Sequence, residues 1–368
     1  MKKYKFRLAE KKDSDGLVNL FRLTPQEGRV VINFERNPDY FIGNGVVASD
    51  TFVLIAIETS SGNVVGCSSF GCREVFVNGK PKKIRYAGDL RVHPDHRQGI
   101  VLVGIYRESR KHLTENEWMQ TAVLEENLAS INTITKKRSS LPSYYRCGRL
   151  KSHLVYVPRK VSRVTKKTFN IRNATSADVE NMQIYFDGLA PEYQFYPVYK
   201  FENIQKNDPY YFGLKIEDYS LCINPNGELI GVLGIWNQKQ FKQTRIMDYK
   251  GGMQYVRYLY NLYSMLVGAL RLPSVGGELD YMSLHSLLIK DNDPEVFDAL
   301  LCHCFERLKL MGCGALLVGV MDDDALKHVI GRFRCREHYT LHYLATYGDF
   351  DPREILDSRS LYLETVRL

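Results

Sequence analysis

The chain has 368 residues, of which 44% are hydrophobic and 25% are charged, and it carries a formal net charge of +8. This length suffices for two domains with real cores, and the composition excludes a disordered, collagenous or coiled-coil chain. The positive charge favours anionic partners such as a phosphate-bearing cofactor, an acidic substrate or nucleic acid, without selecting among them.

No targeting or membrane-spanning segment is expected. The basic start, Met1 to Arg7, has no apolar stretch behind it, and the most apolar run, Leu262 to Leu270, is far shorter than the roughly 20 residues that cross a bilayer. The eight cysteines lack the spacing of a disulfide framework or a zinc site, which predicts reduced thiols and no metal. We therefore expect a cytoplasmic protein without a membrane partner.

The first half of the chain shows strand and helix patterns in a clear order. The patterns predict a strand at 4–9, helices within 11–45, strands at 51–58, 64–77 and 82–92, a helix at 98–112, a strand at 118–124, a helix at 127–137 and a β segment at 144–157. Antiparallel hairpins followed by a β-α-β unit predict a mixed, mainly antiparallel sheet flanked by helices, the α/β class.

The second half follows the same order with one addition. Its patterns predict a strand near 281–289, a helix at 294–311, a strand at 314–320, a helix at 323–330 and a closing β-hairpin near 338–347. The addition is a stretch at 253–271 with an apolar stripe at helical spacing, formed by Val256, Leu259, Tyr260, Tyr263 and Leu266. Such a stripe predicts a helix packed into the core or between domains.

The two halves also share residues at a fixed offset. Arg7, Ala9 and Asp13 recur as Arg172, Ala174 and Asp178, 165 positions further on, and a hairpin glycine pair, Gly62 and Gly66, recurs at the same offset as Gly227 and Gly231. Two separated blocks at one offset indicate a duplicated domain. We therefore expect related domains at 1–158 and 169–368, joined by a basic surface linker at 159–168.

The stretch most informative about function runs from Asp89 to Val101, where a predicted strand turns into a predicted helix. The turn contains Pro94, Arg97 and Gly99. Backbone amides at such a turn and at the start of a helix have no internal partner, so they can bind a diphosphate. Arg97 adds positive charge, and Gly99 allows close approach of the ligand.

This loop resembles the acetyl-CoA loop of the GNAT acyltransferase superfamily, approximately Val-x-Pro-x-x-Arg-x-x-Gly-x-Gly/Ala. Val92, Pro94 and Arg97 match in register, whereas Gly99 falls one residue early and a large apolar residue replaces the second small one. The resemblance implies two GNAT-like domains and acetyl-CoA as co-substrate. It implies cofactor contacts from Leu90, Arg91, Val92, Arg97, Gln98, Gly99, Ile100 and Val101, with Asn127 holding the pantetheine arm.

The resemblance and elementary acid–base chemistry suggest catalytic residues. Tyr144, four residues before Gly148, resembles the family's tyrosine that protonates the departing thiolate. A lysine-like amine must lose a proton, which costs roughly 4 to 5 kcal/mol at neutral pH, so a base is useful. The candidates are Asp89 on the central strand and Glu125 and Glu126 after the next one.

The second half has no equivalent loop. The corresponding stretch, Ile289 to Glu295, carries three carboxylates where a diphosphate needs positive charge. We therefore expect this half to be a degenerate, structural or substrate-shaping domain.

These features lead to one expected function and two alternatives. The expectation is an acetyl-CoA-dependent N-acetyltransferase that acts on the amine of a small molecule or peptide. One alternative is another acyl or aminoacyl transfer on the same paired fold, as in N-myristoyltransferases or Fem-type peptidyltransferases. The other is a non-catalytic binding protein with a basic surface, but no recognised nucleic-acid motif is present, so nucleic acid is not the expected partner.

Overall fold

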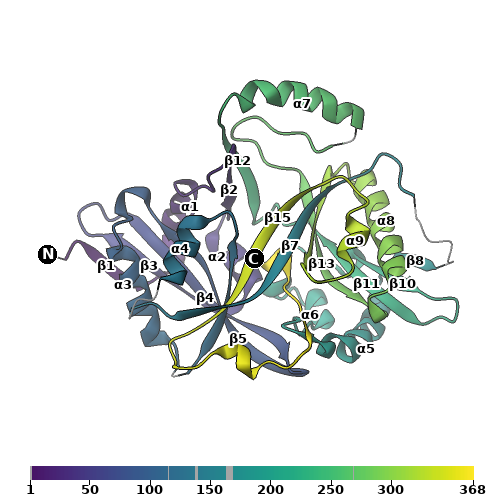
Figure 1. The fold of residues 1–368 in the computed structure, drawn as a ribbon, viewed down its shortest axis with the longest axis horizontal. Coiled ribbons are helices and arrows are strands. Elements are labelled where there is room, and N and C mark those ends of the chain that lie inside the picture. Colours follow the sequence, from purple (N-terminus) through teal and green to yellow (C-terminus); the bar gives the residue numbers. More distant parts are fainter. Residues whose placement is uncertain (1, 115, 137–139, 163–168, 268) are drawn as a thin grey trace.

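The computed structural model describes residues 2–114, 116–136, 140–162, 169–267 and 269–368. One 12-stranded sheet runs through the molecule (Figure 1). Its strands lie in the order β1 (Tyr4–Leu8), β3 (Ser49–Glu58), β4 (Val64–Val77), β5 (Lys80–Val92), β6 (Trp118–Leu124), β15 (Cys335–Thr346), β7 (Ser143–Tyr156), β14 (Ala315–Met321), β13 (Tyr281–Ile289), β11 (Leu229–Trp236), β10 (Tyr219–Ile223) and β8 (Asn170–Asn173).

Helices and two small sheets complete the fold. The helices are α1 (Ser14–Arg22), α2 (Tyr40–Val47), α3 (Ile100–Ser109), α4 (Leu128–Thr135), α5 (Val179–Leu189), α6 (Phe201–Gln205), α7 (Met253–Val267), α8 (Pro294–Leu310) and α9 (Lys327–Ile330). The small sheets pair β2 (Val30–Glu35) with β12 (Gln243–Tyr249), and β9 (Tyr193–Gln194) with β16 (Ser360–Leu361). The predicted α/β class and the mainly antiparallel sheet are confirmed.

The sequence repeat is also a repeat in structure. In the first half the Arg7 guanidinium holds the Asp13 carboxylate through two bonds of 2.7 Å just before α1. In the second half Arg172 holds Asp178 through bonds of 2.7 and 2.6 Å just before α5. Both carboxylates also accept a hydrogen bond from a backbone amide three residues earlier, so one device starts the first helix of each half.

The two halves exchange their last strands. β15, from the end of the chain, lies between β6 and β7, and β7 in turn pairs with β14. The predicted closing hairpin near 338–347 is wrong, because Cys335–Thr346 is one continuous strand whose neighbours come from the first half. A boundary at 158 therefore divides the sequence but not the sheet. Part of the expected linker, residues 163–168, lies outside the described residues.

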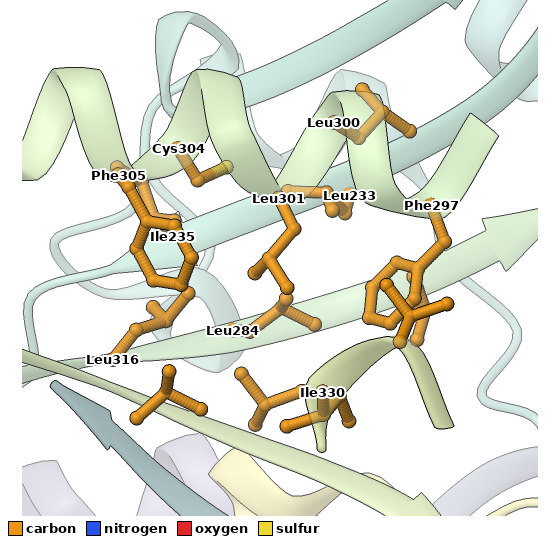
Figure 2. Packing of buried hydrophobic residues seen from close by; sticks show 14 of the residues in the cluster. Leu233, Ile235, Leu284, Phe297, Leu300, Leu301, Cys304, Phe305, Leu316 and Ile330 are labelled. Atoms are coloured by element: carbon orange, nitrogen blue, oxygen red, sulfur yellow. The ribbon is translucent and has the colours of Figure 1, made fainter. Parts of the chain in front are cut away.

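Each half has its own apolar core against the sheet. In the second half α8 packs its side chains onto β11, β13 and β14 (Figure 2), in a cluster that includes Leu233, Ile235, Leu284, Phe297, Leu301, Phe305 and Leu316. In the first half α3 contributes Val101 and Ile105 to a cluster with Leu54, Phe70 and Met119. Burying each such side chain stabilises the fold by about 1.5–3 kcal/mol, so α3 and α8 are firmly held on the sheet.

Two segments differ from the sequence prediction. The region 11–45, predicted to be helical, also contains β2, which pairs with β12 from the other half. The apolar stripe at 253–271 does form helix α7, but its predicted burial is wrong, since Leu259 is 71% exposed and Leu266 is 69% exposed. Among the described residues, no helix is both long and apolar enough to cross a membrane.

Candidate active site

The sheet opens between β5 and β6. These parallel strands pair only at Arg85 with Met119 and at Tyr86 with Gln120, and the ladder stops toward their carboxyl ends. Beyond Tyr86, β5 carries a bulge, where Asp89 has a φ of 52° and the register against β4 shifts. A bulge leaves a backbone amide outside the ladder. The carboxyl ends of parallel strands that part in this way are a common place for an extended ligand.

The predicted diphosphate loop lies at the end of β5. After Val92 the chain makes a 3-10 turn, Pro94–His96, and enters α3 through Gly99, which has a φ of 89°. A side chain at position 99 would meet nothing within 4 Å, so the positive φ, rather than lack of space, favours glycine here. Gly99, the N-cap residue of α3, has no side chain that could accept hydrogen bonds from the first amides of the helix.

The same loop carries exposed positive charge. The Arg97 side chain is exposed, and its Nε donates to the carbonyl oxygen of Val92 at 3.2 Å, which holds the guanidinium beside the strand end. First-turn amides and the dipole of a ten-residue helix attract an anion at this end. The predicted contacts from Val92 to Val101 therefore lie together, in a geometry that suits a diphosphate.

Asp89 lies at the bulge but is already paired. Its carboxylate accepts hydrogen bonds from Arg36 at 2.9 and 3.1 Å and from the Tyr40 hydroxyl at 3.0 Å. Burial raises the pKa of this carboxyl, but the charge and hydrogen bonds of Arg36 outweigh burial and lower the pKa below its ordinary value. A carboxylate held in this way is a weak proton acceptor.

Tyr144 lies on β7 and faces α3. Its hydroxyl is 2.7 Å from the hydroxyl of Tyr106 on α3. Burial raises the pKa of Tyr144 well above its ordinary value, and the neighbouring Tyr106 adds to the shift. The hydroxyl therefore keeps its proton at neutral pH.

The remaining predicted residues follow β6. The Glu125 carboxylate is 2.5 Å from the guanidinium of Arg149, which also contacts Asp322 at 3.1 Å. Glu126 is exposed and lies 3.6 Å from His338. Asn127 caps α4, because its side-chain oxygen accepts a hydrogen bond from the amide of Ser130 at 3.1 Å.

Sequence reasoning missed several groups that gather around the bulge. Arg36 and Tyr40 come from a region where no functional residue was predicted. Lys242, from the second half, is close to them, and its Nζ donates to the backbone oxygen of Leu368 at 2.5 Å. Burial lowers the pKa of Lys242 to about 7, and the charges of Arg36 and Arg73 act in the same direction. No local motif marks these residues, because the fold joins them from distant parts of the chain.

The second half contains the same bulge, but the chain itself fills it. Ser286 on β13 also has a φ of 52°, at a register shift against β11. Its amide donates to the Glu364 carboxylate at 2.9 Å, and that carboxylate also accepts from the hydroxyls of Tyr199 at 2.7 Å and Tyr362 at 3.0 Å. A carboxylate oxygen of the same chain thus accepts the hydrogen bond of the bulge amide.

The entrance to α8 is likewise filled from within the chain. The Asp293 carboxylate accepts a hydrogen bond from the amide of Glu295 at 2.8 Å, which caps the helix with negative charge. Segment 360–363 lies over the opening between β13 and β14, where a cavity of about 140 Å³ remains beside Leu287 and Gly319. Across the described part of the chain, no group of three histidine, cysteine or acidic side chains is placed to hold a metal ion.

This architecture is the GNAT fold, present twice on one chain. A tandem GNAT protein from the clavulanic acid biosynthesis pathway matches with a TM-score of 0.52 and 11% identity, over 95% of this chain and 100% of that one. N-myristoyltransferase from Saccharomyces cerevisiae, solved with bound myristoyl-CoA and inhibitors, matches with a TM-score of 0.59 and 11% identity, over 98% of this chain and 85% of that one.

A third solved structure is a GCN5-related glucosamine N-acetyltransferase region in a fungal multi-domain GH3 β-N-acetylglucosaminidase. It matches with a TM-score of 0.58 and 12% identity over 92% of this chain, which spans only 38% of that longer protein. No protein-family model matches the sequence, and no curated protein matches it. At these identities the comparisons establish the fold.

Proposed function

We propose that the chain is an acyl-CoA-dependent N-acyltransferase whose first half binds the CoA thioester. The group transferred is acetyl, and the acceptor is the primary amine of a small molecule or peptide. The proposal is supported by the loop at 92–101 and by solved proteins of the same fold, one of which carries myristoyl-CoA.

One internal comparison carries the proposal. In the second half the bulge amide of Ser286 binds an oxygen of a carboxyl group at 2.9 Å. The first half has the same bulge at Asp89, with the same φ of 52°, and a helix nearby whose N-cap residue is a glycine. The bulge in β5 is therefore suited to receive the carbonyl oxygen of an acyl group, and the loop is suited to receive the diphosphate of the same ligand.

Each part of the first half has a role in this proposal. When bound, the CoA thioester supplies an acyl carbon that an amine can attack. The amides at the start of α3 and Arg97 hold the diphosphate, and the bulge amide donates to the carbonyl oxygen, where negative charge develops. Asp89, held by Arg36 and Tyr40, is a positioning residue that fixes the bulge.

Two proton transfers accompany the reaction. Tyr144 keeps its proton and is proposed to donate a hydrogen bond to the departing thiolate, which takes its proton from water. The thiolate's ordinary pKa near 8.5 lies below the raised pKa of the tyrosine, so full transfer from Tyr144 is unfavourable. Glu125 is proposed to accept the amine proton through water: it is paired with Arg149, as Asp89 is with Arg36, but its side chain is 36% exposed, against 12% for Asp89, so water can reach it.

Calorimetry with acetyl-CoA tests the proposal. The wild-type chain should bind it, and Arg97→Glu should weaken binding by at least about tenfold, because a favourable charge becomes a repulsive one. Arg107→Glu, at an exposed position in the last turn of the same helix, is the matched control and should bind normally. Lack of binding by the wild-type chain, or an equal loss in both variants, would contradict the proposal, and titration with myristoyl-CoA tests whether acetyl is the preferred group.

A further inference from the structure

Helix α7 has its polarity reversed with respect to the protein. It stands apart from the main sheet, attached through β12 (Figure 1). Two of its polar residues are turned toward the segment that follows the helix: Ser264 is 2% exposed, and the Asn261 side chain makes two hydrogen bonds of 2.9 Å with the backbone of Leu272. Eight large apolar side chains face outward and are between 49% and 72% exposed. They are Tyr255, Val256, Tyr258, Leu259, Leu262, Tyr263, Met265 and Leu266.

The outward apolar surface is wide. Successive residues of a helix are turned by about 100°, so the eight exposed apolar residues between 255 and 266 cover about half of the helix circumference. A helix that packs on one protein partner needs an apolar stripe of at least about 100°, so this face is wider than such packing requires. The surface contains three tyrosines, Tyr255, Tyr258 and Tyr263. Tyrosine is favoured where an apolar phase meets water, because its ring is apolar and its hydroxyl is polar.

The charges on and beside this helix are mostly positive. Residues 249–277 include Lys250, Arg257 and Arg271 and no acidic residue, while Asp248 and Glu278 flank this stretch and Glu278 is paired with Arg245. Lys250 is paired with Glu27, whereas Arg257 stacks on the ring of Tyr258 and Arg271 is exposed.

The neighbouring strand adds to this charge. At the start of β15, Arg334 is exposed and donates to the Tyr263 hydroxyl at 3.4 Å, and the charge of the exposed Arg336 acts on Tyr260. Cations therefore border the apolar surface on the side of the protein body.

We propose that α7 is a membrane-surface helix, which inserts its apolar face into the headgroup boundary of an anionic lipid bilayer. Apolar insertion with cations at the level of the lipid phosphates matches both observations. A second copy of the chain is disfavoured as the occupant, since pairing two such helices would bring Arg257, Arg334 and Arg336 of both copies together. The expectation of no membrane partner rested on the lack of a spanning segment, which a helix lying in the interface does not need.

Docking through α7 would also orient the candidate active site. The helix follows β12, which pairs with β2, and β2 ends at Glu35, next to the Arg36 that holds Asp89. Glu35 pairs with Gln243, at the end of β12 away from α7, so docking would hold the bulge at the far end of the β2–β12 pair from the lipid surface. The docking proposal does not depend on the proposed catalytic activity, because its test measures binding.

Vesicle flotation of the full chain tests the proposal. The chain should float with phosphatidylcholine vesicles that contain about one third phosphatidylserine, and much less with phosphatidylcholine alone. The double variant Leu259→Glu, Leu262→Glu should lower the bound fraction at least about tenfold. Ile184→Glu on α5, at a side chain that is 64% exposed, is the matched control and should float like the wild-type chain. Circular dichroism establishes that each variant is folded.

Two further measurements can overturn the proposal. Arg257→Gln should weaken binding to the vesicles that contain phosphatidylserine by about fivefold, and should leave binding to phosphatidylcholine vesicles unchanged. Sedimentation reports the oligomeric state, and a dimer that the double variant dissociates, with no vesicle binding by the wild-type chain, would overturn the proposal in favour of self-association. Failure of the wild-type chain to float, or an equal loss in the Ile184→Glu control, would also overturn it.

Discussion

The two halves of the molecule share a fold and a bulge but differ in what meets the bulge. In the first half the strand runs into an exposed loop with Arg97 and a glycine start to α3. In the second half Glu364 occupies the bulge amide and Asp293 caps α8. A duplicated fold can thus keep its backbone geometry in both copies while side chains of its own chain bind the bulge amide in one copy. The predictions below test this contrast in order of expected effect.

The largest effect is expected at the buried ion pair, which only the bulge of the first half has. Arg36→Met leaves the Asp89 carboxylate buried without its cation, and this should lower the free energy of unfolding by about 3–5 kcal/mol. Urea denaturation measures it. Ser286→Ala, at the equivalent bulge, should cost only about 1 kcal/mol. Similar losses in both variants would mean that the bulges are held in the same way.

The second prediction concerns the internal ligand. Glu364→Ala leaves the amide of Ser286 and the hydroxyls of Tyr199 and Tyr362 without their shared acceptor, and should cost about 3 kcal/mol of stability. It should not add a second acetyl-CoA site, because Asp293 still caps α8. Calorimetry counts the sites, and two sites in the variant would show that Glu364 alone closes the second half.

The third prediction concerns pH and the exchanged strand β15. Burial lowers the pKa of His342 from 6.5 to about 3. The unfolded chain therefore takes up a proton that the folded chain refuses, and stability present above about pH 6.5 is lost as the pH falls, by about 2 kcal/mol at pH 5. Urea denaturation of His342→Gln should show a smaller loss between pH 8 and pH 5. The exposed histidine His328 is the control, and an equal change in His328→Gln would contradict the assignment.

The last prediction is that the unfolding transitions of the two halves do not differ. The chain has two tryptophans, Trp118 on β6 of the first half and Trp236 on β11 of the second. Because β7 and β15 cross between the halves, both should unfold together. Fluorescence of Trp118→Phe and Trp236→Phe, each followed against its own circular dichroism curve, should give coincident transitions. Separate transitions would show that the halves are independent despite the shared sheet.

Much of the fold was predictable because its signals are local. Hairpin turns, helical spacing and the Arg7 and Arg172 repeat depend on residues close together in the chain, and the loop at 92–101 carries its own motif. The strand exchange was not predictable, since the pattern of β15 says that it is a strand but not which strand it pairs with. The helical stripe of α7 likewise predicts a helix, but spacing does not say which face meets the protein.

The candidate site divides in the same way. The loop proposed to bind the diphosphate is continuous in sequence, so its residues could be predicted from a local motif. Asp89 and Arg36, which form an ion pair, lie 53 positions apart in the sequence, and Lys242, which is close to both, lies much further along the chain. The pattern of a single sequence does not indicate such contacts. The pairing matters chemically, because it converts an apparent base into a fixed, weakly basic anion.

The position of β15 has a consequence for synthesis. This strand fills the place between β6 and β7, yet it ends at Thr346. The ribosome must therefore release the chain as far as Thr346 before the N-terminal sheet can close. Between the synthesis of β7 and that of β15, β6 and β7 present open edges, so the nascent chain would need protection from mispairing during that interval.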